Sequence, residues 1–329
     1  MKKFELIFKC FGFKIGIKYL YFKGLTFFLK KIFVLSGSHS MVLASIIKRY
    51  VSITDRMVQN YIYNKYRKIY DKYSLEDIEG TVPEDKVIWT CWLQGTNEAP
   101  YAVSKSLESM YKNSGNYRVI VLTLENIQNY VDLDEQIISE YSRNEISPAH
   151  LSDYIRMKVL SVYGGIWLDA TQYMTKEIPE NVWDYPFLVW NRVFDLTGKN
   201  AYIAIPFVEN FNNSFLVGKS GASFYKFASE ITRALLFDDI LKIDYFGNFK
   251  AYFVGIEKIP ALKTMWNEMY TINPYGLLTR QFWNKPISED LKKYIHDEDS
   301  FFFMLTYKKK WIQNVENKLT VQEYIIEEL

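Results

Sequence analysis

Short apolar runs alternate with amphipathic stretches in the first half of the chain. Val87–Leu93 is an apolar run rich in β-formers, which predicts a buried strand. Residues 99–112 predict a helix, Tyr117–Leu122 predicts a second buried strand, and Glu125–Tyr130 opens another helix. Strand and helix in alternation are typical of an α/β fold, with a parallel sheet and helices on its faces.

The next segment repeats this pattern with clearer end signals. Ser147–Pro148 is a helix cap with proline at the first helical position, so a helix is predicted to run to Tyr163. Gly164 and Gly165 end that helix, and Ile166–Leu168 predicts a short strand. The chain therefore reaches the carboxyl end of a third predicted strand.

Three charged residues lie on this helix and strand. Asp153 and Arg156 are three positions apart, so they are neighbours on the helix surface, and Asp169 directly follows the strand. Ligands of open α/β sheets bind at the carboxyl ends of strands, which makes Asp169 a candidate site residue. A surface ion pair followed by a glycine cap explains the same residues without any function.

Charge is unevenly distributed along the 329 residues, although 40 Lys and Arg against 38 acids give a net charge of only +2. Residues 1–49 hold nine lysines and Arg49 against one acid, Glu5, a local charge of +9, which leaves −7 for the remainder. The acidic remainder has no basic stripe that would continue a nucleic-acid groove, so we expect no nucleic-acid partner. The many Phe, Leu and Ile beside these lysines favour an anionic membrane surface.

The basic segment does not fit a membrane span, because lysines interrupt every apolar stretch in it. We therefore expect residues 1–80 to form a basic, aromatic helical extension that contacts the membrane surface, and residues 81–329 to form the α/β domain. A helical extension packed on that domain is the alternative. The chain has only two cysteines, Cys10 and Cys91, which lie far apart and show no metal-ligand spacing. This argues against a disulfide scaffold and a cysteine zinc site, and it favours a reducing cytosol.

Two blocks of sequence resemble a known family. The first block consists of Ala149–Arg156, seven further residues, and Gly164–Thr171 (Gly-Gly-Ile-Trp-Leu-Asp-Ala-Thr). It resembles the capsular polysaccharide synthesis glycosyltransferases, which are relatives of DXD-containing sugar transferases. Ile88–Gly95 and Tyr117–Leu122 are similar to the opening units of that family, and the resemblance covers roughly residues 80–310. It implies a GT-A (Rossmann-like) fold, a UDP-sugar donor and transfer with retention at the anomeric carbon.

The resemblance also implies a divalent metal, Mn²⁺ or Mg²⁺, that would neutralise charge on the departing diphosphate. Asp169 holds the first position of the DXD-like motif and Thr171 the last. Thr171 offers only a neutral hydroxyl, so we expect a weaker metal site unless another residue completes it. Asp297 or Asp299 could complete it, and His296 is a further candidate, although a surface-helix residue is the simplest explanation of His296.

The other site residues that the resemblance implies bind the donor. Asp153 would bind sugar hydroxyls and Arg156 the sugar or diphosphate, so the catalytic set is Asp153, Arg156 and Asp169. The implied nucleotide contacts are Trp89 or Trp92 near the uracil, Gln94 at its edge, Gly164 and Gly165 at close approach, and Ser300 and Lys308 near the diphosphate. Burial in the core, a plain helix cap and a solvated lysine run are the alternative explanations for these residues.

The function that the resemblance implies is a bacterial, retaining hexosyltransferase of capsule or surface polysaccharide synthesis. It would move galactose or glucose from a UDP-hexose to an undecaprenyl-diphosphate-linked saccharide, as a cytoplasmic protein on the inner face of the cell membrane. Three alternatives stay open: a catalytically weak protein that binds nucleotide sugars or glycans, a glycoside hydrolase that uses Asp153 and Asp169, and a membrane scaffold.

Overall fold

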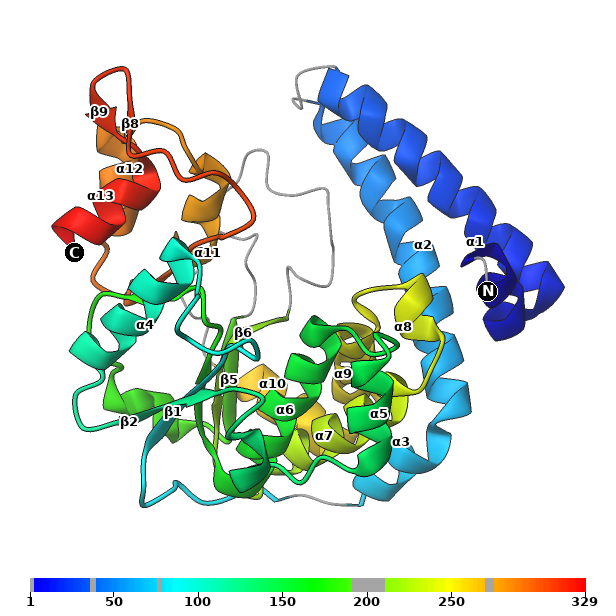
Figure 1. The fold of residues 1–329 in the computed structure, drawn as a ribbon. Helices are drawn as coiled ribbons and strands as arrows, with labels where there is room; N and C mark the ends of the chain where they lie inside the picture. Colours follow the sequence, from blue (N-terminus) through cyan, green and yellow to red (C-terminus); the bar gives the residue numbers. More distant parts are fainter. Residues whose placement is uncertain (1–2, 36–39, 76–77, 191–210, 270–274) are drawn as a thin grey trace.

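The computed structural model describes residues 3–35, 40–75, 78–190, 211–269 and 275–329 (Figure 1). The helices are α1 (Lys3–Leu35), α2 (Met41–Lys65), α3 (Arg67–Tyr73), α4 (Tyr101–Asn113), α5 (Glu135–Ser142), α6 (Pro148–Tyr163), α7 (Ser223–Leu236), α8 (Ile240–Ile243), α9 (Gly247–Lys258), α10 (Pro260–Glu268), α11 (Tyr275–Leu278), α12 (Glu289–Ile295) and α13 (Val321–Glu328). The strands are β1 (Val87–Cys91), β2 (Arg118–Leu122), β3 (Gly165–Leu168), β4 (Gln172–Met174), β5 (Phe187–Trp190), β6 (Asn212–Gly218), β7 (Phe302–Met304), β8 (Asn314–Val315) and β9 (Lys318–Leu319). The 3₁₀ turns are η1 (Ile127–Asn129), η2 (Glu180–Asp184) and η3 (Thr279–Phe282).

A five-stranded sheet in the order β2-β1-β3-β6-β5 forms the centre of the molecule. β1 runs parallel to β2 and β3, whereas β6 runs antiparallel to both β3 and β5. The carboxyl ends of β1 and β3 therefore meet the beginning of β6 at one edge of the sheet. The predicted α/β fold with parallel strands and a helical amino-terminal segment is confirmed.

The sheet is buried on both faces, as expected for parallel strands with near-continuous apolar runs. Every residue of β1, β3 and β5 is buried, and Trp89, Trp167 and Trp190 are among the largest fully or almost fully buried side chains. α6 packs against α7, which in turn contacts α3 and α9. The sheet and these helices form one large hydrophobic core.

The carboxyl-terminal part of the chain adds a smaller lobe with its own core. β7 pairs antiparallel with β4, with Tyr173 opposite Phe303. Both side chains belong to a second hydrophobic cluster that also contains Trp283 and Val321. The pairing of β4 with β7 therefore fixes the residues after Met304 beside the edge where β3 ends.

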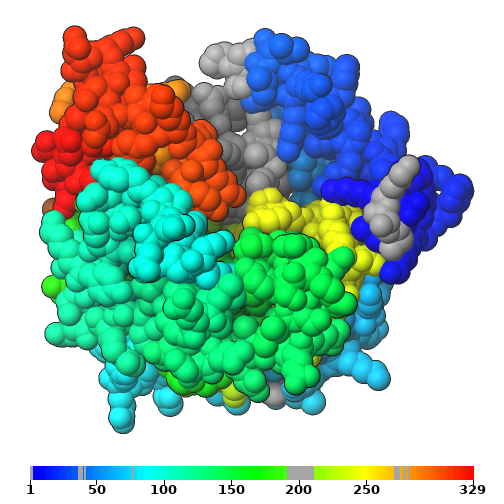
Figure 2. Space-filling model, viewed as in Figure 1, coloured from blue at the N-terminus to red at the C-terminus, as the bar shows by residue number. Residues whose placement is uncertain are grey.

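The amino-terminal segment forms a hairpin of two long helices, α1 and α2, beside the body (Figures 1 and 2). α1 is interrupted at Gly12, whose φ of 68° is left-handed, so two helical pieces meet there. The hairpin packs on the body through α8 and α9. Within the described residues, no helix combines the length and apolarity needed to cross a bilayer. The division at residues 80 and 81 stays a prediction.

Element boundaries differ from the sequence prediction where local signals were weak. The helix expected to open at Glu125–Tyr130 is only the turn η1, and the true helix α5 begins after Asp134, whose side chain accepts from the Ile137 amide. Asp134 is a strong helix cap, so the start of α5 follows the capping rule rather than the apolar pattern.

Candidate active site

A cavity of about 470 Å³ opens at the edge where β1 and β3 end and β6 begins. Its walls come from parts of the chain that are distant in sequence. They are Cys91–Gln94 after β1, residues 148–156 of α6, Ala170 with its neighbours after β3, Asn212–Ser214 of β6, the turn Tyr245–Phe249 between α8 and α9, and Arg280 with Met304–Lys308 of the lobe. The topology alone brings these segments together, as expected for a ligand site at strand ends.

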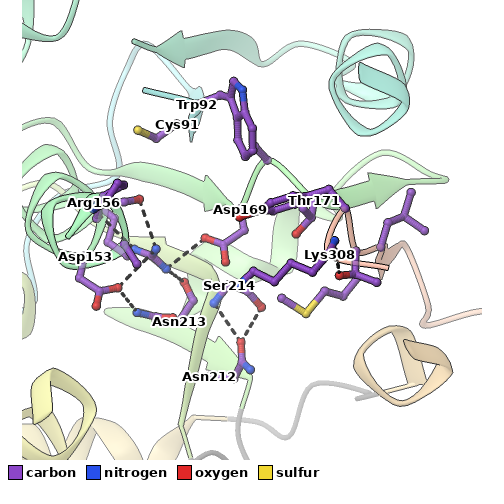
Figure 3. Close-up of a pocket in the computed structure, with 18 of the residues that line it drawn as sticks. Cys91, Trp92, Asp153, Arg156, Asp169, Thr171, Asn212, Asn213, Ser214 and Lys308 are labelled. Carbon is purple, nitrogen blue, oxygen red and sulfur yellow. Dashed lines mark hydrogen bonds and ion pairs between the residues drawn. The ribbon is translucent and has the colours of Figure 1, made fainter. Parts of the chain in front are cut away.

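Arg156 lies at the centre of this site, between two carboxylates (Figure 3). Its Nη1 donates to the Asn213 carbonyl oxygen at 2.6 Å and lies 3.1 Å from Asp169 Oδ1. Its Nη2 lies 3.4 Å from Asp153 Oδ1. The guanidinium stacks 5.0 Å from the centre of the Trp167 ring. Asp153 and Arg156 are therefore part of a buried network, and the alternative explanation of a surface ion pair does not hold.

Charge balance explains how an arginine is tolerated in this position. Burial lowers the pKa of Arg156, but the carboxylates of Asp169 and Asp153 raise it more, and the net shift is upward. Asp153 accepts further hydrogen bonds from Asn213 Nδ2 at 2.9 Å and Asn248 Nδ2 at 3.1 Å. With its oxygens held in this way, Asp153 orients Arg156.

Asp169 is the more exposed of the two carboxylates of the network, both of which line the cavity. Its side chain is 26% exposed, against 12% for Asp153 and 7% for Arg156. Trp167 Nε1 donates to Asp169 Oδ1 at 2.9 Å, and the Asp169 amide donates to the Ser214 carbonyl at 2.9 Å. Asp169 is thus held on its Oδ1 side while the rest of the carboxylate borders the cavity.

Thr171 also lines the cavity, two residues beyond Asp169. Its carbonyl accepts from the Leu305 amide at 2.8 Å, which ties this turn to the lobe. In the ranges that the structure describes, no group of three or more His, Cys, Asp or Glu side chains could hold a metal ion. One carboxylate and one hydroxyl fit Mg²⁺ or Mn²⁺ only when substrate phosphates supply further oxygens.

Two cationic side chains of the lobe complete the polar side of the cavity. Lys308 lines it, as the sequence predicted, and its amide donates to Thr306 Oγ1 at 3.2 Å. Arg280 also lines it, with Nη1 3.3 Å from Met304 Sδ. No sequence signal marks Arg280, because it lies far from every recognisable block. Both cations are exposed and can approach an anionic ligand.

Trp92 and Gln94 line the cavity just after the end of β1, and Figure 3 shows the Trp92 ring. The Trp92 ring meets the Tyr307 ring edge to face, with 5.2 Å between centroids. Cys91 beside it is buried, and burial raises the pKa of its thiol to about 12, although Arg156 and Ser152 oppose that shift. Cys91 therefore stays a neutral thiol and gives this wall no nucleophile.

Three of the predicted nucleotide contacts lie outside the cavity. Trp89 is 2% exposed and packs against Tyr130 and Tyr163, and its Nε1 donates to the Gly164 carbonyl at 2.9 Å. Gly164 caps the carboxyl end of α6 and Gly165 begins β3, whereas the cavity lies at the end of β3. The structure corrects these assignments: Trp89 is a core residue, and both glycines belong to the opposite edge of the sheet.

Close packing is the physical reason for the two glycines. Gly164 has φ +66°, and a Cβ there would lie 2.7 Å from the Ser220 nitrogen. Gly165 has φ +111°, and a Cβ there would lie 2.7 Å from Trp89 Nε1 and 2.8 Å from the Val87 carbonyl oxygen. Only glycine fits where helix α6 turns directly into a central strand.

Replacing Gly165 with alanine tests this correction. We expect Gly165→Ala to lower the free energy of unfolding by about 2 kcal/mol or more, because strain and overlap with β1 add together. UDP affinity of the folded protein should not change. Gly221→Ala is the matched control: φ is +77°, but the nearest atom is 3.9 Å from the added Cβ, so strain alone applies. Urea unfolding and UDP titration calorimetry make the comparison, and a loss of affinity without a loss of stability would restore the nucleotide assignment.

Two further predicted residues are also placed elsewhere. His296 caps α12 and its Nε2 lies 2.8 Å from the Tyr324 hydroxyl, so it belongs to the lobe surface and not to the cavity. Ser300 is 4% exposed and is not among the residues that line the cavity. Asp297 and Asp299 do not line it either. The residues after Ser300 enter the core through β7, which explains why this segment turns away.

Several residues of the site were not predicted as site residues. Asn213 and Asn248 hold Asp153, and Tyr245 lines the cavity while its carbonyl lies 3.0 Å from His150 Nε2. The segments that contain Asn213 and Tyr245 resemble the family only weakly, and nothing in them distinguishes a side chain that lines a site from one that packs in the core. Only the antiparallel arrival of β6 brings Asn213 beside Asp153.

The chain is similar in sequence to a known family and to a known glycosyltransferase. Residues 40–324 match the sequence profile of a family described as capsular polysaccharide synthesis protein. The O-glycosyltransferase braB of Annulohypoxylon truncatum is 25% identical over 170 residues, which are 47% of this chain and 38% of that protein. The chain thus matches well under half of the length of that curated relative.

A solved structure described as PaToxG glycosyltransferase has a TM-score of 0.35 and 15% identity, and the match covers 74% of this chain and 94% of that chain. A likeness at this level carries no argument about mechanism. The profile match is different, because it includes most of the chain and all the segments that build the cavity. The protein therefore belongs to the capsular polysaccharide synthesis protein family.

Proposed function

We propose that this protein is a retaining glycosyltransferase of the GT-A type that moves a hexose, galactose or glucose, from a UDP-hexose to a lipid-linked saccharide. The observation that carries the proposal is the buried Asp153–Arg156–Asp169 network, which borders a cavity at the carboxyl ends of parallel strands. Membership of the capsule-synthesis family and the glycosyltransferase relatives support the same class of reaction.

Each part of the donor has matching chemistry in the cavity. Trp92 and Tyr307 offer aromatic surface to the uracil, with Gln94 nearby for its polar edge. Lys308 and Arg280 offer positive charge to the diphosphate. These assignments place the base at the end of β1 and the diphosphate between β3 and the lobe.

Asp169 and Thr171 would hold a divalent metal ion together with the diphosphate. The metal would supply positive charge that stabilises the leaving UDP. Because Thr171 contributes a neutral hydroxyl, the protein alone binds the ion weakly, and affinity depends on bound nucleotide. His296 takes no part, since it lies outside the cavity.

The transfer itself needs few protein groups. The acceptor hydroxyl attacks the anomeric carbon from the face that UDP leaves, the bond from that carbon to the β-phosphate oxygen breaks, and the hydroxyl proton passes to the departing phosphate. Arg156 fixes Asp169 in place through their 3.1 Å contact, and Asp153 keeps Arg156 in position. Because these charged side chains are already oriented, they do not have to reorient as the transition state forms.

We propose an undecaprenyl-diphosphate-linked saccharide as the acceptor and the inner face of a bacterial cell membrane as the location. The basic amino-terminal segment supports this, since anionic lipid and a diphosphate anchor both attract lysines. A glycoside hydrolase is less well supported, because the side chain of Asp153 is only 12% exposed and accepts hydrogen bonds from Asn213 and Asn248. It is not free to flank a glycosidic bond.

UDP release from a panel of UDP-sugars tests the proposed function. Purified protein should release UDP slowly from one UDP-hexose with Mn²⁺ or Mg²⁺ present, through transfer to water, and EDTA should abolish the release. Nucleotide binding without release in the presence of a membrane extract that contains acceptor lipids would favour a binding protein. Absence of both UDP release and UDP binding by calorimetry would contradict the proposal.

A further inference from the structure

The second part of α1, residues 13–35, has an inner face and an outer face. Tyr19, Thr26 and Phe33 are buried and are spaced seven residues apart, which is about two helical turns. They face α2 and the body, where Phe33 joins a small cluster with Ile47 and Val51. This inner face accounts for the packing of the hairpin.

The opposite face carries large apolar side chains that are mostly open to solvent. We call it the outer stripe, and its members are spaced four, four, seven and seven residues apart. It consists of Phe13 (75% exposed), Ile17 (46%), Tyr21 (64%), Phe28 (59%) and Leu35 (86%). At about 100° per residue these side chains fall within roughly 80° of one another, on the side away from Tyr19 and Phe33.

Charge identifies what this stripe faces. The sequence has no acidic residue between Glu5 and Asp55, while Lys14, Lys18 and Lys31 are exposed beside or within the outer stripe. Other lysines of α1 are committed to the body: Lys9 Nζ lies 2.5 Å from Asp239 Oδ2, and Lys23 Nζ lies 3.7 Å from Asp244 Oδ2. An apolar helix face with a lysine border complements an anionic lipid surface.

We propose that the outer stripe lies in the headgroup region of an anionic bilayer, with α1 along the membrane plane. The inference deepens the proposed function, since a membrane-bound acceptor is its reason, and it narrows the predicted contact from the whole basic segment to one face of residues 13–35. The hairpin and the lobe both extend upward from the body in Figures 1 and 2, the hairpin on the right and the lobe on the left.

Other occupants fit the stripe less well. A second copy of the chain, packed face to face, would bring two sets of Lys14, Lys18 and Lys31 together without any acid to offset them. A nucleic acid would satisfy the lysines but would leave the aromatic and aliphatic side chains in water. Apolar burial combined with several basic groups is what stable peripheral attachment requires.

Vesicle sedimentation of the full chain tests the inference. Wild-type protein should pellet with vesicles of equal parts phosphatidylglycerol and phosphatidylcholine, and at least about tenfold less with phosphatidylcholine alone. The variant Phe13→Ser/Phe28→Ser/Leu35→Ser should bind the anionic vesicles at least about tenfold more weakly. A matched variant, Leu75→Ser/Tyr111→Ser/Leu124→Ser, removes exposed apolar side chains away from the stripe and should bind as wild type.

Each contrary result has a defined meaning. Wild type that does not pellet, or a stripe variant that pellets like wild type, overturns the inference. A dimer in sedimentation velocity that the stripe substitutions dissociate, without vesicle binding, overturns it in favour of a second copy. UDP release without membranes should be equal in the wild type and the stripe variant. Normal vesicle binding without any UDP release would therefore contradict the proposed function and leave the membrane inference intact.

Discussion

Replacing Asp169 with asparagine should lower UDP-hexose turnover by about 10³-fold while the protein stays folded. Asparagine keeps the size of the side chain and can still meet Arg156 and Trp167, but it removes the negative charge that borders the cavity. The lost charge weakens metal binding and the stabilisation of leaving UDP. UDP release at saturating donor and Mn²⁺ measures the effect, with circular dichroism as the check on folding.

Two further variants make that result specific. Asp184→Asn changes an exposed carboxylate away from the cavity and should have wild-type turnover. Thr171→Asp adds a second acid and should tighten Mn²⁺ binding at least about tenfold. Unchanged turnover in Asp169→Asn, or unchanged Mn²⁺ affinity in Thr171→Asp, would contradict a metal site at this position.

Replacing Lys250 with methionine should lower the free energy of unfolding by about 3–5 kcal/mol. Lys250 is 1% exposed, and its Nζ lies 2.7 Å from Asp55 Oδ1 of α2 and 2.5 Å from Asp244 Oδ2. Without the ammonium, buried Asp55 loses its ion pair, and buried Asp244 keeps only the more distant Lys23 ammonium at 3.7 Å. Urea unfolding measures the loss, and Asp55→Asn/Asp244→Asn/Lys250→Met should recover part of it, because no charge is then left behind.

The pH dependence separates lost charge from lost packing. In the wild type burial raises the pKa of Asp55 more than Lys250 lowers it, whereas for Asp244 burial is outweighed by Lys250 and Lys23 and the pKa is lowered. In Lys250→Met both folded-state pKa values should rise, because fewer positive charges then oppose the effect of burial. The loss of stability should then be largest near neutral pH and shrink as the pH falls towards 3.8. A loss that does not depend on pH would indicate packing alone.

Much of the fold could be predicted because its local signals agree with its tertiary packing. The Ser147 cap, Pro148 and the glycine pair define α6, and the structure ends it at Tyr163 as expected. The apolar run at Val87 gives β1, although the strand stops at Cys91 and not at Leu93. Signals of this kind depend only on residues that are neighbours in sequence, so they can be interpreted without knowledge of the fold.

A site residue can be predicted from the sequence only when it is known at which end of the strands it lies. Asp153, Arg156 and Asp169 were placed together correctly, since helix and strand are consecutive. Gly164 and Gly165 were assigned to the nucleotide because a phosphate contact and tight packing both need glycine. Strand direction decides between these, and it puts the glycines at the far edge. Arg280 reaches the cavity only through the lobe, which no sequence pattern anticipates.

The pairing of β4 with β7 joins two walls that belong to separate hydrophobic clusters. Trp92 packs on the large core, whereas Leu305 belongs to the core of the lobe. A ligand between Trp92 and Lys308 therefore contacts both the sheet and the lobe. Phe301 and Phe302 beside this pairing belong to the large core and pack on Phe215 of β6, so a rotation of the lobe would disturb that core. The two walls are therefore brought together when the chain folds, and the cost of ordering them is part of folding and not of ligand binding.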